Sequence, residues 1–260
     1  MNSLFHNKKS KVVAIHAALY LVIALFISII VFHVWFPGSI AEISGIESIY
    51  LLLITVDFIF GPTLTLIVWN TKKSRRKLFI DTTIVITIQL AALGYGMMTI
   101  YQNRPVYIVF ETDRLRMVNA AEIAPEDLEK ASDHWKNLPR LGPKLLSTRV
   151  PKDGEEMLRS IDFSIAGKEP SVRPEMWEEY TPAKKQVRAA SRSLPELLAV
   201  YPEKKEEIIR LAEKFNVPYA CISWLPFTSV RSMDWVALID TRTVEPFTYI
   251  QGDGFIPRHR

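Results

Sequence analysis

The stretch VVAIHAALYLVIALFISIIVFHVWF, residues 12–36, contains 25 residues without a single Asp, Glu, Lys or Arg. Two further apolar stretches follow, residues 48–69 and residues 78–101, each with one acidic residue. As α-helices that rise ~1.5 Å per residue, the three would be roughly 33 to 38 Å long, enough to cross a hydrocarbon core of about 30 Å. The sequence therefore predicts a membrane protein with three transmembrane α-helices in residues 1–101.

The charges that flank these spans predict the orientation of the chain. Three lysines precede the first span: Lys8, Lys9 and Lys11. The stretch NTKKSRRK, residues 70–77, puts five positive charges between the second and third spans, whereas residues 37–47 contain no Lys or Arg. Because Lys and Arg near span ends stay on the cytoplasmic side, we expect a cytoplasmic N-terminus and a periplasmic C-terminal domain. The chain is thus expected to cross its membrane three times, and in a bacterium the outer side is the periplasm.

Charge is divided unevenly along the chain of 260 residues. Residues 1–101 hold 8 of the 32 Lys and Arg residues and 4 of the 28 acidic residues, so the net charge of +4 belongs to this part. The basic excess lies in short clusters beside apolar spans, which removes the usual reason to infer a nucleic-acid partner. The first span is also longer than the core of a cleaved signal peptide, so we expect it to be retained.

Polar residues inside the spans are the first candidates for function, because an ionisable group at mid-bilayer costs at least ~2.5 kcal/mol to insert and usually faces protein or water. Asp57 lies near the centre of the second span. Gly61-Pro62 follows one turn later and predicts a kink, since Pro62 removes the hydrogen bond to the carbonyl of Phe58. We expect Thr63, Thr65 or a neighbouring helix to bond that carbonyl.

Asp81, near the cytoplasmic end of the third span, has two possible partners. Its depth matches that of His16 in the first span, which allows a contact between the two helices. The alternative is local neutralisation by Lys77 or another basic residue of the 70–77 loop. Local neutralisation is the simpler interpretation, because Asp81 is close to the membrane surface.

One stripe of the third span carries small and polar residues. At 100° per residue, Asp81, Val85, Gln89, Ala92 and Gly96 fall within a wedge of roughly 80°. Ala92 and Gly96 form a small-xxx-small pair, which allows two helices to approach closely, and Gln89 can form a hydrogen bond across such a contact. The partner could be the second span of the same chain or a helix of another protein.

The remainder, residues 102–260, predicts one α+β domain of a size that can bury its own core. Strands are expected at residues 106–110 and 115–118 around an ETDR turn, and three more at residues 216–227, 233–240 and 244–251. Helices are expected around Pro125, from Asp153 onward, and over residues 195–215 with a break at Pro202.

This domain lacks the sequence motifs of common enzymes. It has no G-x-S-x-G, P-loop, H-E-x-x-H or C-x-x-C, and its histidines are His134 and His259 alone. Cys221 is the chain's one cysteine, so no intrachain disulfide or Cys-based zinc site can form, and its apolar surroundings predict a buried residue in a strand. We expect no catalytic residues, no cofactor and no metal. Tryptophans 135, 177, 224 and 235 are expected in the core or at its rim.

Three stretches together resemble the type IV pilin accessory proteins, small inner-membrane proteins of Gram-negative bacteria that are encoded beside a pilin gene. They are DFIFGPTLTLIVW (residues 57–69), LFIDTTIVITIQLAALGYG (residues 78–96) and RPVYIVFETDRLRMVNAAEI (residues 104–123). The resemblance covers residues 8–123 well and the rest only in length and general character; Leu115 departs from an aromatic that many relatives carry. The matching positions are Asp57, Gly61, Pro62, Asp81, Gln89, Gly96, Arg104, Asp113 and Arg114.

The resemblance implies a non-enzymatic, chaperone-like helper of pilus biogenesis whose partners are the type IV pilin and membrane lipids. Pilins of this class wait in the inner membrane as single helices with globular heads in the periplasm. Our hypothesis is that the stripe on the third span, together with Asp57 and Gly61-Pro62, docks the pilin helix while the outer domain contacts the head. The alternative is a membrane-anchored periplasmic sensor or scaffold whose basic loop contacts anionic lipid or a cytoplasmic partner. The sequence does not set the oligomeric state.

Overall fold

The computed structural model describes the backbone of residues 2–68 and 73–257, and side chains from residue 10 onward within these ranges except that of residue 130. Several features expected from the sequence therefore lie outside the described residues: the side chains of Lys8 and Lys9, the last residue of the second span, residues 70–72 of the basic loop, and His259.

The described chain divides into two compact units. The first comprises Met1–Val34 and Gly45–Gln102, and the second comprises Trp35–Ser44 and Asn103–Arg260. The short segment between the first two long helices is thus grouped with the C-terminal domain. We call these the helical unit and the soluble unit and describe each separately.

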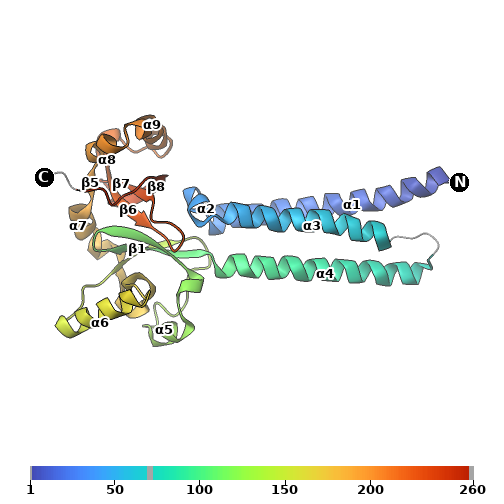
Figure 1. Ribbon diagram of the computed structural model, residues 1–260, viewed down its shortest axis with the longest axis horizontal. Coiled ribbons are helices and arrows are strands. Elements are labelled where there is room, and N and C mark those ends of the chain that lie inside the picture. The colour runs from blue at the N-terminus through green and yellow to red at the C-terminus, as the bar shows by residue number, and fades with distance from the viewer. Residues whose placement is uncertain (1, 69–72, 258–260) are drawn as a thin grey trace. The chain divides into compact units, whose positions relative to one another are not determined.

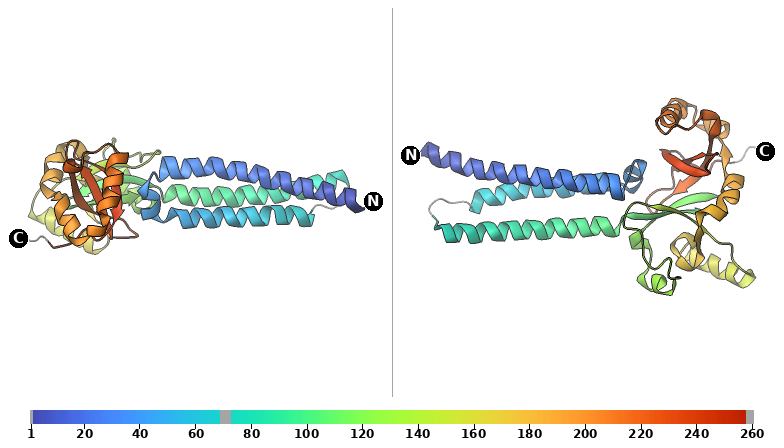
Figure 2. Two further views of the ribbon diagram at one scale, coloured as in Figure 1. Left: turned by 90° about the horizontal axis from the view of Figure 1, so that it is seen from above. Right: turned by 180° about the vertical axis from the view of Figure 1, so that it is seen from behind.

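The helical unit contains three long helices, which run side by side (Figures 1 and 2). They are α1 (Asn2–Ile29), α3 (Ile46–Val68) and α4 (Arg75–Gln102); a π-helical segment (Ile30–Trp35) extends α1. Segments long and apolar enough to cross a membrane run over Ser10–Trp35, Ile46–Val68 and Arg75–Gln102. The expected membrane protein with three transmembrane helices is confirmed.

Packing within the helical unit centres on α3, which contacts both α1 and α4. The face of α3 that carries Tyr50, Asp57, Gly61 and Thr65 is buried between its neighbours. Large apolar side chains on the outer faces, such as Leu51 and Ile67, are exposed. This distribution is that of a unit surrounded by lipid, in which small and polar residues mediate the contacts between helices.

The soluble unit is built on a mixed sheet with the strand order β4-β3-β1-β2-β6-β7-β8, and β5 pairs with β6 (Figure 1). The strands are β1 (Pro105–Glu111), β2 (Arg114–Asn119), β3 (Lys144–Thr148), β4 (Trp177–Glu179), β5 (Arg192–Ser193), β6 (Ile222–Thr228), β7 (Trp235–Asp240) and β8 (Glu245–Gln251). Two pairs, β1 with β3 and β2 with β6, are parallel, and the remaining pairs are antiparallel. The expected α+β class is confirmed.

Six α-helices belong to the described part of the soluble unit. They are α2 (Ser39–Ser44), α5 (Pro125–Lys130), α6 (Gly154–Ile165), α7 (Tyr180–Ala190), α8 (Leu194–Val200) and α9 (Lys205–Lys214). The helix expected from Asp153 is present as α6, with the Asp153 carboxylate accepting a hydrogen bond from the backbone N–H of Glu156. The expected break at Pro202 separates α8 from α9. The sequence did not predict β3, β4, β5, α2 or α7.

Two apolar clusters form the core on which these elements rest. In one, Leu197 of α8 and Ile208 of α9 pack with Trp224 and Leu238 of the sheet. In the other, Tyr107 and Val109 of β1 pack with Trp177, while Trp135 lies half-buried at its edge. The tryptophans thus lie in the core or at its rim, as expected.

The prediction for Cys221 was wrong in part. This residue lies in a 3-10 turn (Tyr219–Cys221) that precedes β6, and its side chain is half-buried. Pro218 sets up this turn, with the backbone N–H of Cys221 donating to its carbonyl, so the strand begins one residue later.

Candidate functional site

A layer of polar side chains crosses the helical unit at the level of Gly61. The side-chain amide of Gln89 on α4 lies directly over Gly61, in the space that a Cβ atom would need. On the other side, Nδ1 of His16 on α1 lies 2.8 Å from Oγ1 of Thr65 on α3. Two of the predicted residues, Gly61 and Gln89, are therefore brought together, and His16 joins them at the same level.

A second polar contact between α1 and α3 lies further along the helices. The hydroxyl of Tyr50 donates to the carbonyl of Ala24 over 2.7 Å and lies 2.7 Å from the hydroxyl of Ser28. The hydroxyl of Tyr20 donates to the carbonyl of Ile54 over 3.3 Å. Contacts of this kind provide association energy in lipid, where apolar surface alone does not drive helices together.

Asp57 lies on the same buried face of α3, one turn from Gly61, and only 7% of it is exposed. Its Oδ2 atom has no hydrogen-bond partner among the described residues. The Nε2 atom of Gln89 is likewise buried and unbonded within the described part of the chain. Buried polar groups are normally satisfied, so both atoms mark places where a further partner would lower the free energy.

An apolar groove of about 250 Å³ opens between α1 and α4, with Thr65 of α3 at its floor. The α1 wall includes Ile15, His16 and Leu19, and the α4 wall includes Ile86, Gln89, Leu90 and Leu93. The residues with polar groups in the lining are His16, Tyr20, Thr65, Thr82 and Gln89, and the others are aliphatic. Such a groove is suited to the side chains of another apolar helix or of a lipid.

The residues of the stripe expected on α4 do not share one environment: some pack against α3, and one is exposed. Gly96 packs against Leu53 of α3, since a Cβ at residue 96 would lie 2.6 Å from Cδ1 of Leu53. Gln89 contacts Gly61 in the same way, so this part of the stripe packs within the chain, one of the two alternatives left open by the sequence. Ala92 is exposed and lies outside this contact.

Asp81 is paired locally. Its Oδ2 atom lies 2.5 Å from Nζ of Lys73 in the basic loop, and His16 bonds Thr65 instead. The simpler of the two interpretations of Asp81 is therefore the one that the structure shows, with Lys73 rather than Lys77 as the described partner.

Thr63 and Thr65, two of the expected partners of the Phe58 carbonyl, bond other groups. Pro62 lies inside α3, which remains helical on both sides of it. Thr63 donates its hydroxyl to the carbonyl of Ile59 over 2.6 Å, and Thr65 is bonded to His16. The reason is geometric, because a threonine hydroxyl in a helix reaches the carbonyl four residues earlier.

The remaining predicted residues lie in the soluble unit and are not gathered into one site. Arg104 is buried, and its Nε and Nη2 atoms donate to the carbonyl of Pro139 over 3.2 and 2.9 Å. Asp113 is exposed at the turn between β1 and β2. Nε of Arg114 lies 3.6 Å from Oε2 of Glu111, an ion pair without a hydrogen bond.

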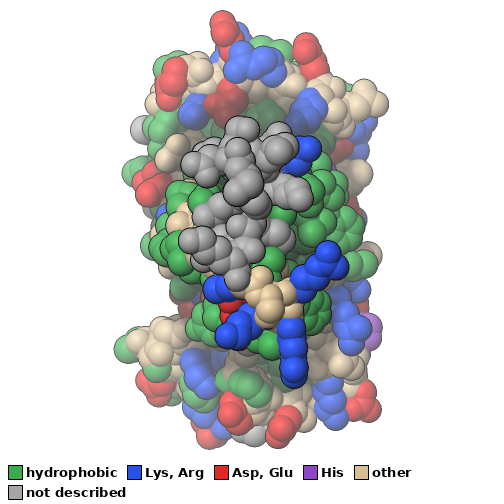
Figure 3. All heavy atoms as spheres, turned by 90° about the vertical axis from the view of Figure 1, so that its right-hand side faces the viewer, with side chains coloured by type: hydrophobic (Ala, Val, Ile, Leu, Met, Phe, Trp, Pro, Cys, Tyr) green, Lys and Arg blue, Asp and Glu red, His purple; other side chains and the backbone are tan. Residues whose placement is uncertain are grey.

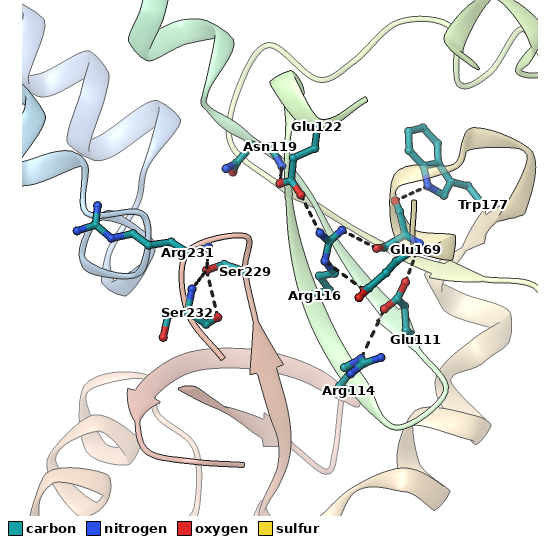
Figure 4. A network of polar contacts seen from close by, with 11 residues as sticks. Glu111, Arg114, Arg116, Asn119, Glu122, Glu169, Trp177, Ser229, Arg231 and Ser232 are labelled. Atoms are coloured by element: carbon teal, nitrogen blue, oxygen red, sulfur yellow. Dashed lines mark hydrogen bonds and ion pairs between the residues drawn. The ribbon is translucent and has the colours of Figure 1, made fainter. Parts of the chain in front are cut away.

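A polar network surrounds this hairpin, as Figure 4 shows. Arg116 on β2 donates to the Ser171 hydroxyl and to Glu122 over 2.9 and 2.8 Å, and its Nε lies 3.5 Å from Glu169. The Glu111 carboxylate accepts a hydrogen bond of 2.6 Å from the backbone N–H of Ser171. Burial raises the pKa of Glu111 above its usual range, against the lowering effects of Ser171 and of the Arg114 charge. Burial also raises the pKa of Glu122, despite Arg116.

Figure 4 also shows the loop that anchors α2. The Ser229 hydroxyl accepts hydrogen bonds from the backbone N–H groups of Arg231 and Ser232 over 3.2 and 3.1 Å. Arg231 in turn donates to the carbonyl of Ser44 over 3.3 Å. These arrangements fix loops and strands in place. Among residues 10–68 and 73–257, no three His, Cys, Asp or Glu side chains are grouped so that they could hold a metal ion.

Comparison with known proteins finds relatives that match almost the whole chain. The fimbrial assembly proteins of serogroup I and serogroup E1 of Dichelobacter nodosus are each 30% identical over 247 residues, which is 95% of this chain and 96% of the relative. The fimbrial assembly protein of serogroups C1 and C2 of the same organism is 36% identical over 122 residues, 47% of this chain and 93% of the relative. No protein-family model matches the chain. No solved structure matches it.

Proposed function

Because the chain belongs to the fimbrial assembly protein family, we propose that it is a non-enzymatic inner-membrane accessory protein that binds the type IV pilin and promotes its assembly into the pilus. Membership confirms the resemblance to the type IV pilin accessory proteins, and the names of the relatives support a role in pilus assembly. Binding of the pilin and a chaperone-like action are our own step beyond those names.

The observation that carries the proposal is the groove between α1 and α4. Its floor is α3 and its two walls are helices, so a fourth helix that lies in it would contact all three. The walls are aliphatic, and a pilin subunit is anchored by a single apolar helix. Gln89 and His16 would offer hydrogen-bonding groups to that helix, which matters because such bonds help helices to associate in lipid.

The predicted residues take different parts in this proposal. Gln89 would contact the pilin helix directly, while Gly61 and Gly96 let α3 and α4 approach each other closely enough to shape the groove. We propose that the buried Asp57, whose Oδ2 atom has no hydrogen-bond partner among the described residues, gains one when the complex forms, and that Pro62 and Ala92 adjust the surface offered to the partner. Asp81, held by Lys73, would fix the membrane-surface end of α4.

For the soluble unit we propose contact with the globular head of the pilin. The β1–β2 hairpin presents Asp113 at its tip and holds Arg114 through Glu111, and Arg104 fixes the segment around Pro139. These residues would support or border the contact surface without forming a catalytic centre.

The orientation that this function requires has a cytoplasmic N-terminus and a periplasmic soluble unit. Four basic residues are exposed where α4 begins: Lys73, Arg75, Arg76 and Lys77. Figure 3 looks onto this end of the helical unit and shows Lys and Arg side chains beside the apolar helices. Such a cluster favours the cytoplasmic side and can contact anionic lipid. Reporter fusions to the C-terminus test this orientation, and a C-terminus inside the cell would contradict the function.

The direct test fills the groove. Ile86 lines it, whereas Ile84 is exposed on the same helix and does not. Ile86→Trp should abolish co-purification of the pilin with the detergent-extracted protein and reduce piliation, while Ile84→Trp should leave both near wild type. Equal recovery of pilin with both variants would contradict the groove as the binding site and would favour the sensor or scaffold alternative.

A further inference from the structure

Helix α6 of the soluble unit has its apolar face turned outward. Met157, Leu158, Ile161 and Ile165 fall within a wedge of roughly 100° around the helix axis. All four are exposed, Leu158 to 65% and Ile165 to 81%. A soluble domain normally turns such a stripe toward its core, so an exposed one marks an interaction surface.

The opposite side of α6 carries polar residues and Phe163, and it holds the helix to the domain. Ser160 is buried, and Arg149 makes two hydrogen bonds to the Glu156 carboxylate, of 2.9 and 2.6 Å. Further along, the guanidinium of Arg173 lies 4.8 Å from the centroid of the Phe163 ring. The anchors therefore fix the direction of the helix, and they keep the four apolar side chains on the outside.

The charges beside the stripe argue against a membrane as its partner. Helices that lie on membranes carry Lys and Arg on their polar face. Helix α6 carries Glu155, Glu156 and Asp162 against a single base, Arg159. An anionic lipid surface would repel this arrangement.

The size of the stripe argues against a stable dimer of this chain. A stable interface buries about 800 Å² per partner and involves roughly 20–30 residues on each side. Four side chains on a helix of 12 residues fall far short of that. The surface fits a short-lived contact with a different protein that is held in place by other means.

We infer that the apolar stripe of α6 binds the head of the pilus subunit at an apolar patch bordered by Lys or Arg. The inference rests on the proposed function, since the transmembrane groove would supply the affinity that the small stripe lacks. Asp162 flanks the stripe and would face the basic border of the partner. Two weak contacts on one chain bind cooperatively, because the first raises the effective concentration for the second.

The test uses a photo-crosslinking amino acid at position 161 of the full-length protein in cells that make the pilus subunit. Tyr219, exposed on a different part of the soluble unit, is the control position. We expect a crosslink to the pilus subunit from position 161 and little or none from position 219. In the protein carrying the crosslinker at 165, Asp162→Lys should reduce the yield several-fold, whereas Glu213→Lys on α9 should not change it.

Three results would overturn the inference: a crosslink to lipid, a crosslink to a second copy of this chain, or a yield no higher than that of the control position. Crosslinking from Leu90 in the groove separates this failure from failure of the proposed function. If the groove position still captures the subunit, only the role of α6 is wrong. If neither position captures it, the proposed function itself fails.

Discussion

Gly61 of α3 and Gln89 of α4 share one packing position: the amide of Gln89 lies where a Cβ of residue 61 would be. The ring of His16 borders the same space, with Nε2 at 3.4 Å from that point. Because residue 61 has no Cβ, the end of the flexible Gln89 side chain can lie between the helices. The contact also fixes one wall of the groove that we assign to the pilin helix.

Gly61→Ala should therefore destabilise the helical unit through Gln89. The Gly61→Ala/Gln89→Ala double variant should recover part of the loss, because the second change removes the overlapping side chain. For residues in direct contact such a coupling energy is about 0.5–3 kcal/mol. Thermal unfolding in detergent measures it, and Gly94→Ala, where a Cβ would meet nothing within 4 Å, is the control. Strictly additive effects would show that the two residues do not compete for this space.

Gly254 should tolerate a methyl group far less well than Gly252. A Cβ at residue 254 would lie 2.6 Å from the backbone Cα of Pro226, which cannot move without distorting β6. At residue 252 it would be 3.5 Å from the Tyr201 ring, an ordinary contact. We expect Gly254→Ala to cost about 1–3 kcal/mol and Gly252→Ala to cost less. Unfolding midpoints of the two full-length variants compare them, and equal losses would be inconsistent with the packing described.

Ionisation of the buried Glu111 should lower the free energy of unfolding as the pH rises. Burial raises its pKa in the folded protein above the value of 4.5 that it has when unfolded. Above pH 4.5 the unfolded chain loses this proton before the folded protein does. The contribution of Glu111 to stability is therefore fully present below pH 4.5 and is lost as the pH rises through the pKa of the folded protein. Glu111→Gln removes this decline, so relative to wild type the variant should be more stable at about pH 7 than at about pH 4.

Melting curves of both proteins across this range measure the effect. Glu122, whose pKa is also raised, is present in both proteins and drops out of the comparison. A difference between variant and wild type that does not change with pH would show that Glu111 has no raised pKa in the folded state.

Glu156 should hold α6 in place. The hydrogen bonds from Arg149 lower the pKa of Glu156 to about 2, so its contribution is present above the unfolded value of 4.5 and is lost as the pH falls toward 2. Near neutral pH, Glu156→Gln should increase hydrogen exchange over residues 154–165. Glu155→Gln is the matched control, because Glu155 lies 3.9 Å from Arg159 and both side chains are largely exposed. Unchanged exchange in the Glu156 variant would mean that other contacts suffice to anchor the helix.

The sequence predicts the elements whose signals are local. Long apolar runs gave the three spans, and Asp153 and Pro202 marked the ends of helices correctly. Strands β3 and β4 were missed because each is short and pairs with a strand far away in sequence: β3 pairs with β1, and β4 pairs with β3. The stripe on α4 could be seen in the sequence. Whether it packs against α3 of the same chain or against a helix of another protein depends on Leu53 and Gly61, which only the folded structure places beside it.

The apolar spacing of Met157, Leu158, Ile161 and Ile165 was also present in the sequence. The exposure of these side chains could not be predicted, because it follows from the anchors on the opposite side of α6.

The measurement that tests the central claim most directly places a photo-crosslinking amino acid at Leu90 in the groove and, separately, at Tyr95. Both are on α4, but Tyr95 is 79% exposed and does not line the groove. If a pilin helix lies between α1 and α4, Leu90 will capture the pilin in intact cells and Tyr95 will capture chiefly lipid. Capture of pilin from Tyr95 alone, or from neither position, would contradict the account.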